Sequence, residues 1–332
     1  MRAEAPVDAF AADVARDLQR TPKQLQSQYL YDTLGSSLFE AICRLPWYRI
    51  TRAESHLLST HATDIVARLA PVSSGSCTII ELGVGSGEKL ATILDALPRG
   101  VAPQVHLVDI SPAALDATAA RVSHLPPEQI VRHEGTYEQG LAAVAPPAAT
   151  LSRTPGPMPE ARARRLLLFL GSNIGNFDAA GAGGLMHAMR RALAPGDMLL
   201  LGADLVKPEP ELIRAYDDPL GVTAAFNKNL LVRINRDLGG EFDLATFEHR
   251  AVWNAPCQRV EMHLVSLIRQ QVAIPAAGIE VEFAAGETIW TESSYKYTPA
   301  SIDRLASASG FHVSGQWTDP DAAYALSLLE VR

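Results

Sequence analysis

The fold of this chain is decided by one stretch, Ile79-Ile80-Glu81-Leu82-Gly83-Val84-Gly85-Ser86-Gly87-Glu88-Lys89, in which a hydrophobic strand leads into a glycine-rich turn and then a helix. The glycines allow backbone torsions and close ligand approach that a Cβ would prevent, and the helix N-terminus offers unpaired N–H groups. A second strand ends in Asp109, roughly 20 residues further on, where a doubly wound fold places a carboxylate on ribose hydroxyls. Together these features predict a nucleotide-sized ligand site, although NAD, FAD and S-adenosylmethionine proteins all use such a turn.

Composition and charge indicate a soluble enzyme with a small-molecule substrate. The 332 residues are 47% hydrophobic and 20% charged, enough for one large core or one core with a cap. No apolar run approaches the roughly 18 residues of a membrane span, and residues 1–10 lack the order of a signal peptide, so a cytoplasmic protein without membrane contact is expected. The net charge of −8, without a basic cluster interleaved with aromatics, argues against nucleic-acid binding.

The cysteines, histidines and acids predict no metal site. Cys43, Cys77 and Cys257 are scattered, which indicates ordinary buried thiols rather than a disulfide framework or a zinc site. The nine histidines show no His-Glu-x-x-His spacing, and Asp217-Asp218 is interpreted as a helix or loop feature. The chain is expected to act as a monomer.

Strand-like and helix-like segments alternate from about residue 76 to residue 205, which predicts a parallel sheet covered by helices. The expected strands are residues 105–109, 130–133, 165–170 and 198–201, and the expected helices are residues 179–193 and 299–309. Residues 311–317 and 324–331 predict a strand hairpin at the sheet edge, and the Ala/Pro-rich residues 142–165 predict a surface loop.

Two segments fall outside this alternation and carry aromatic residues with few glycines, so they are candidates for a substrate cap. The expected substrate-binding domain consists of residues 1–61 and an insertion at 207–294. The expected doubly wound domain consists of residues 62–206 and 295–332.

Nine sequence blocks carry a resemblance to a known family. They are YLYD (29–32), GSSLFE (35–40), RLPWY (44–48), TRAE (51–54), GSNIGN (171–176), AYDD (215–218), GVTAAFN (221–227), RVEM (259–262) and TESS (291–294). With the glycine turn, they resemble the L-histidine Nα-methyltransferases of ergothioneine biosynthesis, which are class I S-adenosylmethionine-dependent methyltransferases. The resemblance covers nearly the whole chain and implies a class I methyltransferase sheet with a smaller substrate-binding domain.

The resemblance places S-adenosylmethionine on Gly83 and Gly85, with Lys89 near its methionine carboxylate and Asp109 on its ribose. A lysine in the first turn of a helix adds a full positive charge to the partial charge of the N-terminus, which suits a carboxylate. Near the adenine, where the family has an Asp-Phe pair, this chain has Gly135-Thr136-Tyr137, so Thr136 and Tyr137 are the expected contacts.

Strand alternation points Glu292 and Ser294 to the same face. A carboxylate acceptor beside a hydroxyl matches the donor and acceptor of a neutral imidazole, and the resemblance implies that these residues hold the histidine ring. Met262, on an adjacent strand, is expected to pack against the ring, with an ordinary core methionine as the alternative of nearly equal weight.

For the amino-acid head group, the resemblance implies contacts from Tyr48, Asn176 and Tyr216, with Tyr31 and Phe39 also in the pocket. Gly171 and Asn173 belong to the same substrate side, and at position 173 the family more often has threonine. Asn176 is expected to accept a hydrogen bond from the α-amine and orient it, and Tyr31 or a water to accept the proton that must leave before attack. Structural alternatives remain for Tyr48, as a contact for Pro46, and for Phe39, as part of an apolar helix face.

The implied reaction is transfer of the sulfonium methyl to the α-nitrogen of histidine, three times, to give hercynine. Three alternatives stay open: a methyltransferase for another amino acid such as tryptophan, a nicotinamide oxidoreductase, and a non-catalytic sensor of histidine or S-adenosylmethionine.

Overall fold

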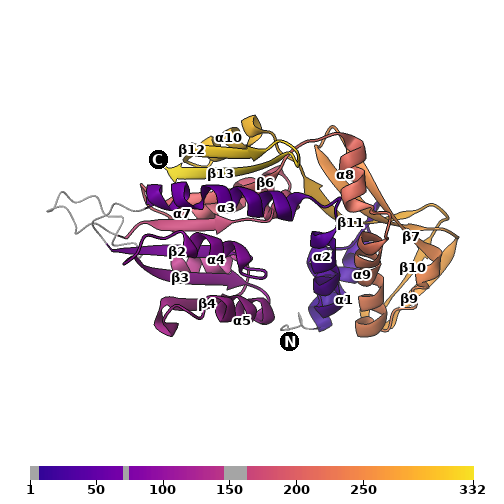
Figure 1. Cartoon of the computed structure of the whole chain (residues 1–332). Coiled ribbons are helices and arrows are strands. Elements are labelled where there is room, and N and C mark those ends of the chain that lie inside the picture. Colours follow the sequence, from indigo (N-terminus) through magenta and orange to yellow (C-terminus); the bar gives the residue numbers. More distant parts are fainter. Residues whose placement is uncertain (1–6, 70–74, 146–162) are drawn as a thin grey trace. The chain divides into compact units, whose positions relative to one another are not determined.

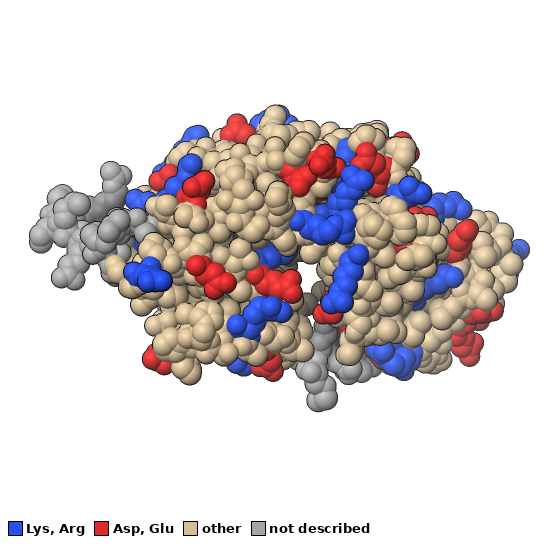
Figure 2. All heavy atoms as spheres, in the orientation of Figure 1, with Lys and Arg blue, Asp and Glu red and all other residues tan. Residues whose placement is uncertain are grey.

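In the computed structural model, residues 7–69, 75–145 and 163–332 are described, and the chain forms two compact units. The first unit comprises residues 50–206 and 297–332, and the second residues 2–49 and 207–296. Each unit is therefore assembled from two separate segments of the sequence. Lys, Arg, Asp and Glu side chains are interspersed over the visible face of the molecule (Figure 2).

The first unit is built on a seven-stranded sheet with the order β12-β13-β6-β5-β2-β3-β4 (Figure 1). Its strands are β2 (Ser76–Leu82), β3 (Ala102–Asp109), β4 (Ile130–Glu134), β5 (Arg165–Phe169), β6 (Met198–Asp204), β12 (Phe311–Asp319) and β13 (Tyr324–Val331). Strands β2 to β6 pair in parallel, whereas β13 is antiparallel to both β6 and β12. This confirms the doubly wound sheet and the C-terminal hairpin.

Two groups of helices pack in this unit. One contains α3 (Ile50–Leu69), α4 (Glu88–Asp95) and α5 (Pro112–Arg121), and the other α6 (Tyr137–Val144), α7 (Ala179–Ala192) and α10 (Pro299–Ala308). Short 3-10 turns lie at η2 (Pro127–Gln129) and η4 (Asn173–Asn176). The apolar runs of β5 and β6 are buried, as expected for strands covered on both faces, and their side chains join one core with those of α7 and α10.

The strand order reverses at β2, because the chain moves from β2 to β3 and β4 on one side and returns to β5 and β6 on the other. In an open parallel sheet, ligands bind at the carboxyl ends of the strands beside such a reversal. The glycine turn follows β2, Asp109 ends β3, and Gly171 lies two residues past the end of β5. The topology therefore gathers these predicted residues at one edge of the sheet.

The second unit contains a four-stranded sheet with the order β1-β11-β8-β7 and a separate β9/β10 hairpin. These strands are β1 (Lys23–Gln24), β7 (Phe247–Asn254), β8 (Arg259–Ser266), β9 (Gln270–Ile274), β10 (Ile279–Phe283) and β11 (Thr288–Tyr295). The helices are α1 (Val7–Leu18), η1 (Ser27–Leu30), α2 (Thr33–Arg44), α8 (Glu209–Tyr216), α9 (Val222–Leu238), η5 (Leu244–Thr246) and η6 (Pro275–Ala277). The N-terminal segment thus supplies both a strand and helices to a unit made mainly from the insertion.

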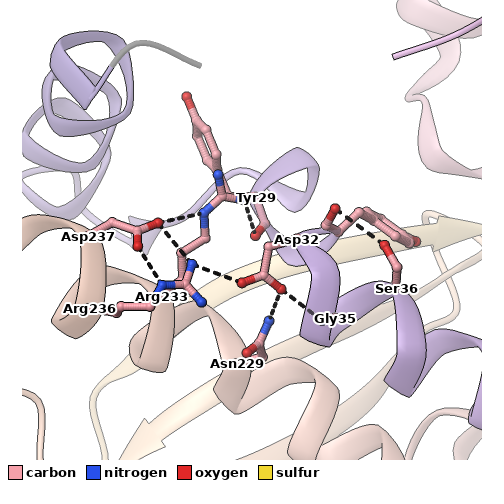
Figure 3. A network of polar contacts seen from close by, with 9 residues as sticks. Tyr29, Asp32, Gly35, Ser36, Asn229, Arg233, Arg236 and Asp237 are labelled. Atoms are coloured by element: carbon pink, nitrogen blue, oxygen red, sulfur yellow. Dashed lines mark hydrogen bonds and ion pairs between the residues drawn. The ribbon is translucent and has the colours of Figure 1, made fainter. Parts of the chain in front are cut away.

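A polar network anchors the start of α2 onto α9 (Figure 3). The Asp32 carboxylate accepts hydrogen bonds from the backbone N–H of Gly35 (2.8 Å), from Asn229 (2.8 Å) and from Arg236 (3.1 Å). Burial by itself raises the pKa of Asp32, but these three donors together hold that pKa below its usual value. The carboxylate therefore stays charged and caps α2.

The structure differs from the sequence-based expectations for one domain boundary and for the cysteines. The expected boundary at residue 61 lies inside α3, which belongs to the first unit, and most of the expected loop at 142–165 lies outside the described residues. Of the cysteines, Cys77 is buried but Cys257 is exposed in the turn between β7 and β8, so the prediction of three buried thiols is wrong. In the described ranges no helix is long and apolar enough to cross a membrane, and no group of three or more metal-binding side chains is found.

Candidate functional site

The turn between β2 and α4 has the backbone geometry that only glycine adopts without strain. Gly83, Gly85 and Gly87 have φ values of +74°, +53° and +73°. A Cβ at Gly87 would press against Thr118, whereas a Cβ at Gly85 would meet no atom within 4 Å. Gly87 is thus required by packing, while Gly85 leaves open space above the backbone.

Residues that follow β4 and β5 approach this turn. A Cβ at Gly83 would lie 3.1 Å from both the Asn173 amide nitrogen and the Tyr137 hydroxyl. A Cβ at Gly171 would lie 3.3 Å from the Lys89 ammonium and 3.7 Å from the Asn173 amide oxygen. Five of the residues predicted from the sequence are therefore neighbours in space.

Asp109 and Thr136 lie at the ends of the next two strands. The Asp109 carboxylate is half-buried and accepts a hydrogen bond from the backbone N–H of Ser111 at 2.8 Å, which holds it at the end of β3. Thr136 is exposed, and its hydroxyl accepts the N–H of Gln139 in a capping box that begins α6. The Thr136 side chain therefore has a structural role in the helix start, next to Tyr137.

The turn after β5 places Gly171, Asn173 and Asn176. Gly171 (φ +77°) and Ser172 (φ +58°) are both left-handed, and the latter is unfavourable for a residue with a Cβ. The buried Ser172 hydroxyl accepts the backbone N–H of Asp204 at 2.9 Å, which stabilises this conformation. Asn176, the last residue of η4, is exposed.

A carboxylate that sequence reasoning left without a role, Glu54, lies beneath this turn. It is fully buried on α3 and accepts the Gly171 N–H with both oxygens, at 2.8 and 2.9 Å. It also forms an ion pair with Lys89 and accepts a hydrogen bond from the Tyr324 hydroxyl. A Cβ at Gly202 would overlap the Glu54 carboxylate and the Tyr324 hydroxyl. The sequence did contain an indication that Glu54 is buried. It lies on the same helix face as the apolar Leu57 and Leu58, which follow one turn later and are buried.

Glu81, at the end of β2, is also buried, at 2% exposure. Burial raises its pKa to about 8; the Lys89 charge opposes this rise, whereas the Glu54 and Asp109 charges add to it. Its Oε2 atom has no hydrogen-bond partner among the described residues. Glu81 is therefore a neutral acid at neutral pH, next to the predicted cofactor residues.

In the second unit, β11 carries Glu292 and Ser294 on one face. Strand β8 runs antiparallel to β11 and aligns Met262 with Glu292, and the register shifts between Trp290 and Glu292. Met262 is 2% exposed. Burial raises the pKa of Glu292 to about 7, against the opposing positive charge of Lys296.

A buried polar cluster adjoins this face. The Tyr216 and Ser294 hydroxyls are 2.8 Å apart, and the Lys296 ammonium donates to Tyr216 at 2.7 Å and to Ser294 at 2.8 Å. Lys296 is only 3% exposed. Sequence reasoning missed Lys296, although the spacing 292, 294, 296 continues the alternation of the strand.

The remaining predicted residues form a chain of aromatic contacts. Tyr31 and Phe39 have ring centroids 5.5 Å apart, Phe39 and Tyr48 6.3 Å, and Tyr48 and Tyr216 6.1 Å. Phe226 of α9, which had no assigned role, contacts both Tyr31 and Phe39. The second unit therefore unites all seven of its predicted residues, through aromatic contacts, the Tyr216–Ser294 hydrogen bond and the paired strands.

A doubly wound sheet with this glycine turn, an acid at the end of β3 and an antiparallel hairpin at its edge has the architecture of a class I methyltransferase. The chain belongs to the family described as histidine-specific methyltransferase, SAM-dependent, whose model matches residues 10–331. It is accordingly an enzyme that uses S-adenosylmethionine, and membership in this family rules out the nicotinamide oxidoreductase considered from the sequence.

Three relatives show the range of the similarity. The histidine N-alpha-methyltransferase of Mycolicibacterium smegmatis is 38% identical, over 99% of this chain and 97% of its own. Ergothioneine biosynthesis protein 1 of Neurospora crassa is 29% identical, over 93% of this chain and 33% of its own. The L-tryptophan methyltransferase trpM of Psilocybe serbica is 26% identical, over 92% of this chain and 87% of its own.

The buried acid of β2 predicts a pH-dependent effect on stability. Because Glu81 keeps its proton up to about pH 8 when folded but only to about pH 4.5 when unfolded, its contribution to stability falls as pH rises between these values. The Glu81→Gln variant lacks this loss. Its free energy of unfolding relative to that of wild type should therefore rise by on the order of a few kcal/mol between pH 5 and pH 9. Urea unfolding read by hydrogen exchange of the β2 amides measures the difference.

The control for this experiment is Glu134→Gln, at an exposed position at the end of β4. Because this side chain is exposed, the substitution is expected to change the free energy of unfolding little. A pH-independent difference for Glu81→Gln would contradict the assignment of a neutral buried acid.

Proposed function

We propose that this protein transfers three methyl groups from S-adenosylmethionine to the α-amino nitrogen of L-histidine, giving hercynine in the first step of ergothioneine biosynthesis. The observation that carries this proposal is the pairing on β11 and β8, where Glu292 and Ser294 share a face and Met262 lies opposite Glu292. Those three groups match an imidazole, with an acceptor, a hydroxyl and an apolar wall. The name of the 38% identical mycobacterial relative supports the same substrate.

The residues of the first unit fit S-adenosylmethionine, which supplies an electrophilic methyl group when bound. The open space above Gly85 admits a ligand close to the backbone, and Lys89 offers a positive charge in the first turn of α4. In this proposal Lys89 contacts the methionine carboxylate, and Asp109 accepts from the ribose hydroxyls. Thr136 and Tyr137 lie near the adenine, and Gly83 permits the approach of Tyr137.

The residues of the second unit are proposed to hold histidine. Glu292 and Ser294 bind the ring and Met262 packs against it, while Tyr48 and Tyr216 hold the head group. Tyr31 and Phe39 offer aromatic faces that stabilise an increasingly methylated, finally quaternary nitrogen.

From the turn after β5, Asn176 is proposed to accept a hydrogen bond from the α-amine, with Gly171 and Asn173 shaping the same turn. Attack requires an uncharged amine, whose reference pKa is about 7.7–8.0, so a proton must leave before each transfer near neutral pH. Tyr31 or a bound water accepts that proton in this proposal. The enzyme is proposed to act as a cytoplasmic monomer.

Mass spectrometry of the purified protein with S-adenosylmethionine and the twenty amino acids tests the reaction directly. Trimethylhistidine as the sole methylated product is the expected result. If tryptophan or another amino acid is methylated instead, that amino acid is the substrate. If the protein binds S-adenosylmethionine but forms no product, it is a sensor of histidine or S-adenosylmethionine rather than an enzyme.

The ring assignment predicts a selective loss in Glu292→Gln. Gln keeps the size of the side chain but loses its charge, so the affinity for histidine should fall about 30- to 100-fold while that for S-adenosylhomocysteine changes less than about twofold. Calorimetric titration of both ligands measures the split. Glu280→Gln, exposed on β10, is the matched control and should change neither value; equal losses of both ligands in Glu292→Gln would make Glu292 a structural residue.

The proton-acceptor assignment predicts a kinetic effect in Tyr31→Phe. Removal of the hydroxyl should lower kcat about 100-fold and change the pH dependence of the rate, because general-base catalysis contributes at least this much. Tyr295→Phe, which removes a hydroxyl that accepts from Arg259 on the same unit, is the control. An active Tyr31→Phe enzyme with the pH–rate profile of wild type would leave water as the acceptor.

A further inference from the structure

Glu54 of α3 is a buried acid that joins two parts of the carboxyl edge of the first sheet. Its side chain has no exposed surface. Both carboxylate oxygens accept the backbone N–H of Gly171, at 2.8 and 2.9 Å, and one of them also pairs with the Lys89 ammonium. Burying a carboxylate is costly unless the group is paired and hydrogen-bonded, so an apolar side chain would fill this position at lower cost if packing were its only purpose.

The two oxygens of Glu54 have different partners, which fixes the orientation of the carboxylate. The Oε1 atom accepts from the Tyr324 hydroxyl, the Oε2 atom pairs with Lys89, and the Gly171 N–H lies between them. Tyr324 is itself fully buried on β13, and Gly202 of β6 leaves the space in which the Tyr324 and Glu54 side chains meet. A small rotation of the carboxylate in either direction would lengthen at least one of these contacts.

The two groups that Glu54 joins have different roles in the proposed function. Lys89 lies in the first turn of α4 and contacts the methionine carboxylate of the cofactor, whereas Gly171 begins the turn that carries Asn176. The Lys89 ammonium lies only 3.3 Å from the point that a Cβ on Gly171 would occupy. A shift of either group is therefore transmitted to the other through one carboxylate.

We propose that Glu54 is a positioning residue for methyl transfer, which holds the Lys89 ammonium and the Gly171 turn in a fixed mutual arrangement. This inference rests on the proposed function, from which the roles of Lys89 and Asn176 are taken. Glu54 touches neither ligand and acts through these neighbours. Such a residue matters because a misplacement of about 1 Å at the reacting groups can cost on the order of 100-fold in rate.

A purely electrostatic role for Glu54 would have the opposite effect on the cofactor. Two carboxylates beside one ammonium repel each other, so removal of the Glu54 charge alone would strengthen the binding of a cofactor carboxylate to Lys89. If Glu54 instead positions Lys89, its removal releases a long side chain that is 26% exposed, and this side chain must be ordered again when the cofactor binds. The sign of the change in affinity therefore separates the two roles.

The test is Glu54→Gln, which keeps the size of the side chain but replaces one acceptor oxygen by a donor NH2 group. Its affinity for S-adenosylhomocysteine should fall about tenfold, and kcat for histidine methylation at saturating ligands about 100-fold. Calorimetric titration and steady-state kinetics measure the two values. In a Lys89→Met background the same substitution should change the affinity less than about twofold, because its effect on the cofactor passes through the ammonium.

Asp197→Asn is the matched control. Asp197 is also fully buried and accepts two backbone N–H groups, those of Arg165 and Ala194, both at 2.9 Å, but it precedes β6 and lies at the opposite end of the sheet. This variant should lower the free energy of unfolding and leave affinity and kcat within about twofold of wild type.

If Glu54→Gln does not fold, Tyr324→Phe removes one donor to the same carboxylate and leaves its charge in place. It should lower kcat about tenfold and the affinity for S-adenosylhomocysteine about threefold, in the same direction as the loss of Glu54.

The positioning role and the proposed function fail in different ways. An unchanged or higher affinity in Glu54→Gln, or in Tyr324→Phe where Glu54→Gln is unfolded, overturns the positioning role and leaves histidine as the substrate. A full tenfold loss in the Lys89→Met background also overturns it. Failure of wild type to methylate histidine overturns the proposed function, and the affinities for S-adenosylhomocysteine then still decide the role of Glu54.

Discussion

The organisation of the first unit depends on one buried carboxylate. Glu54, on α3, binds the backbone of the turn after β5, pairs with Lys89 on α4 and accepts from Tyr324 on β13. A buried charge is tolerated only when it is paired and hydrogen-bonded, so these contacts sustain one another. Glycine at position 202 makes room for the group, and three elements distant in sequence are thereby held around the carboxyl end of the sheet.

The fold followed closely from local features of the sequence. Apolar runs such as that at β5 predict buried strands because hydrophobic periodicity is a local property, and the helices α7 and α10 ended within one residue of expectation. The expected boundary at residue 61 fell inside α3 because nothing local separates the two ends of a continuous helix. Local sequence patterns therefore predict individual helices and strands better than they predict the boundary between the two units.

The site was predictable only where a motif or strand alternation marks it. The glycine turn, Asp109 and the pair Glu292 and Ser294 have such marks, and their assignment to ligands remains a prediction. The partners Glu54 and Lys296 had no role assigned, because Glu54 is defined by contacts with Gly171 and Tyr324, 117 and 270 positions away, and the hydroxyl of Tyr216 is 80 positions from Lys296. Contacts of that range depend on the folded sheet rather than on spacing.

The register shift in β11 has an evolutionary consequence. Before the shift the buried side chains are Ile289 and Thr291, and after it Ser294, so the interior face changes from odd to even positions. Insertion or deletion of one residue between the shift and Ser294 would turn Ser294 to the opposite face of the sheet. The face that carries Glu292 and Ser294 is therefore more sensitive to a change in strand length than to a replacement of single side chains.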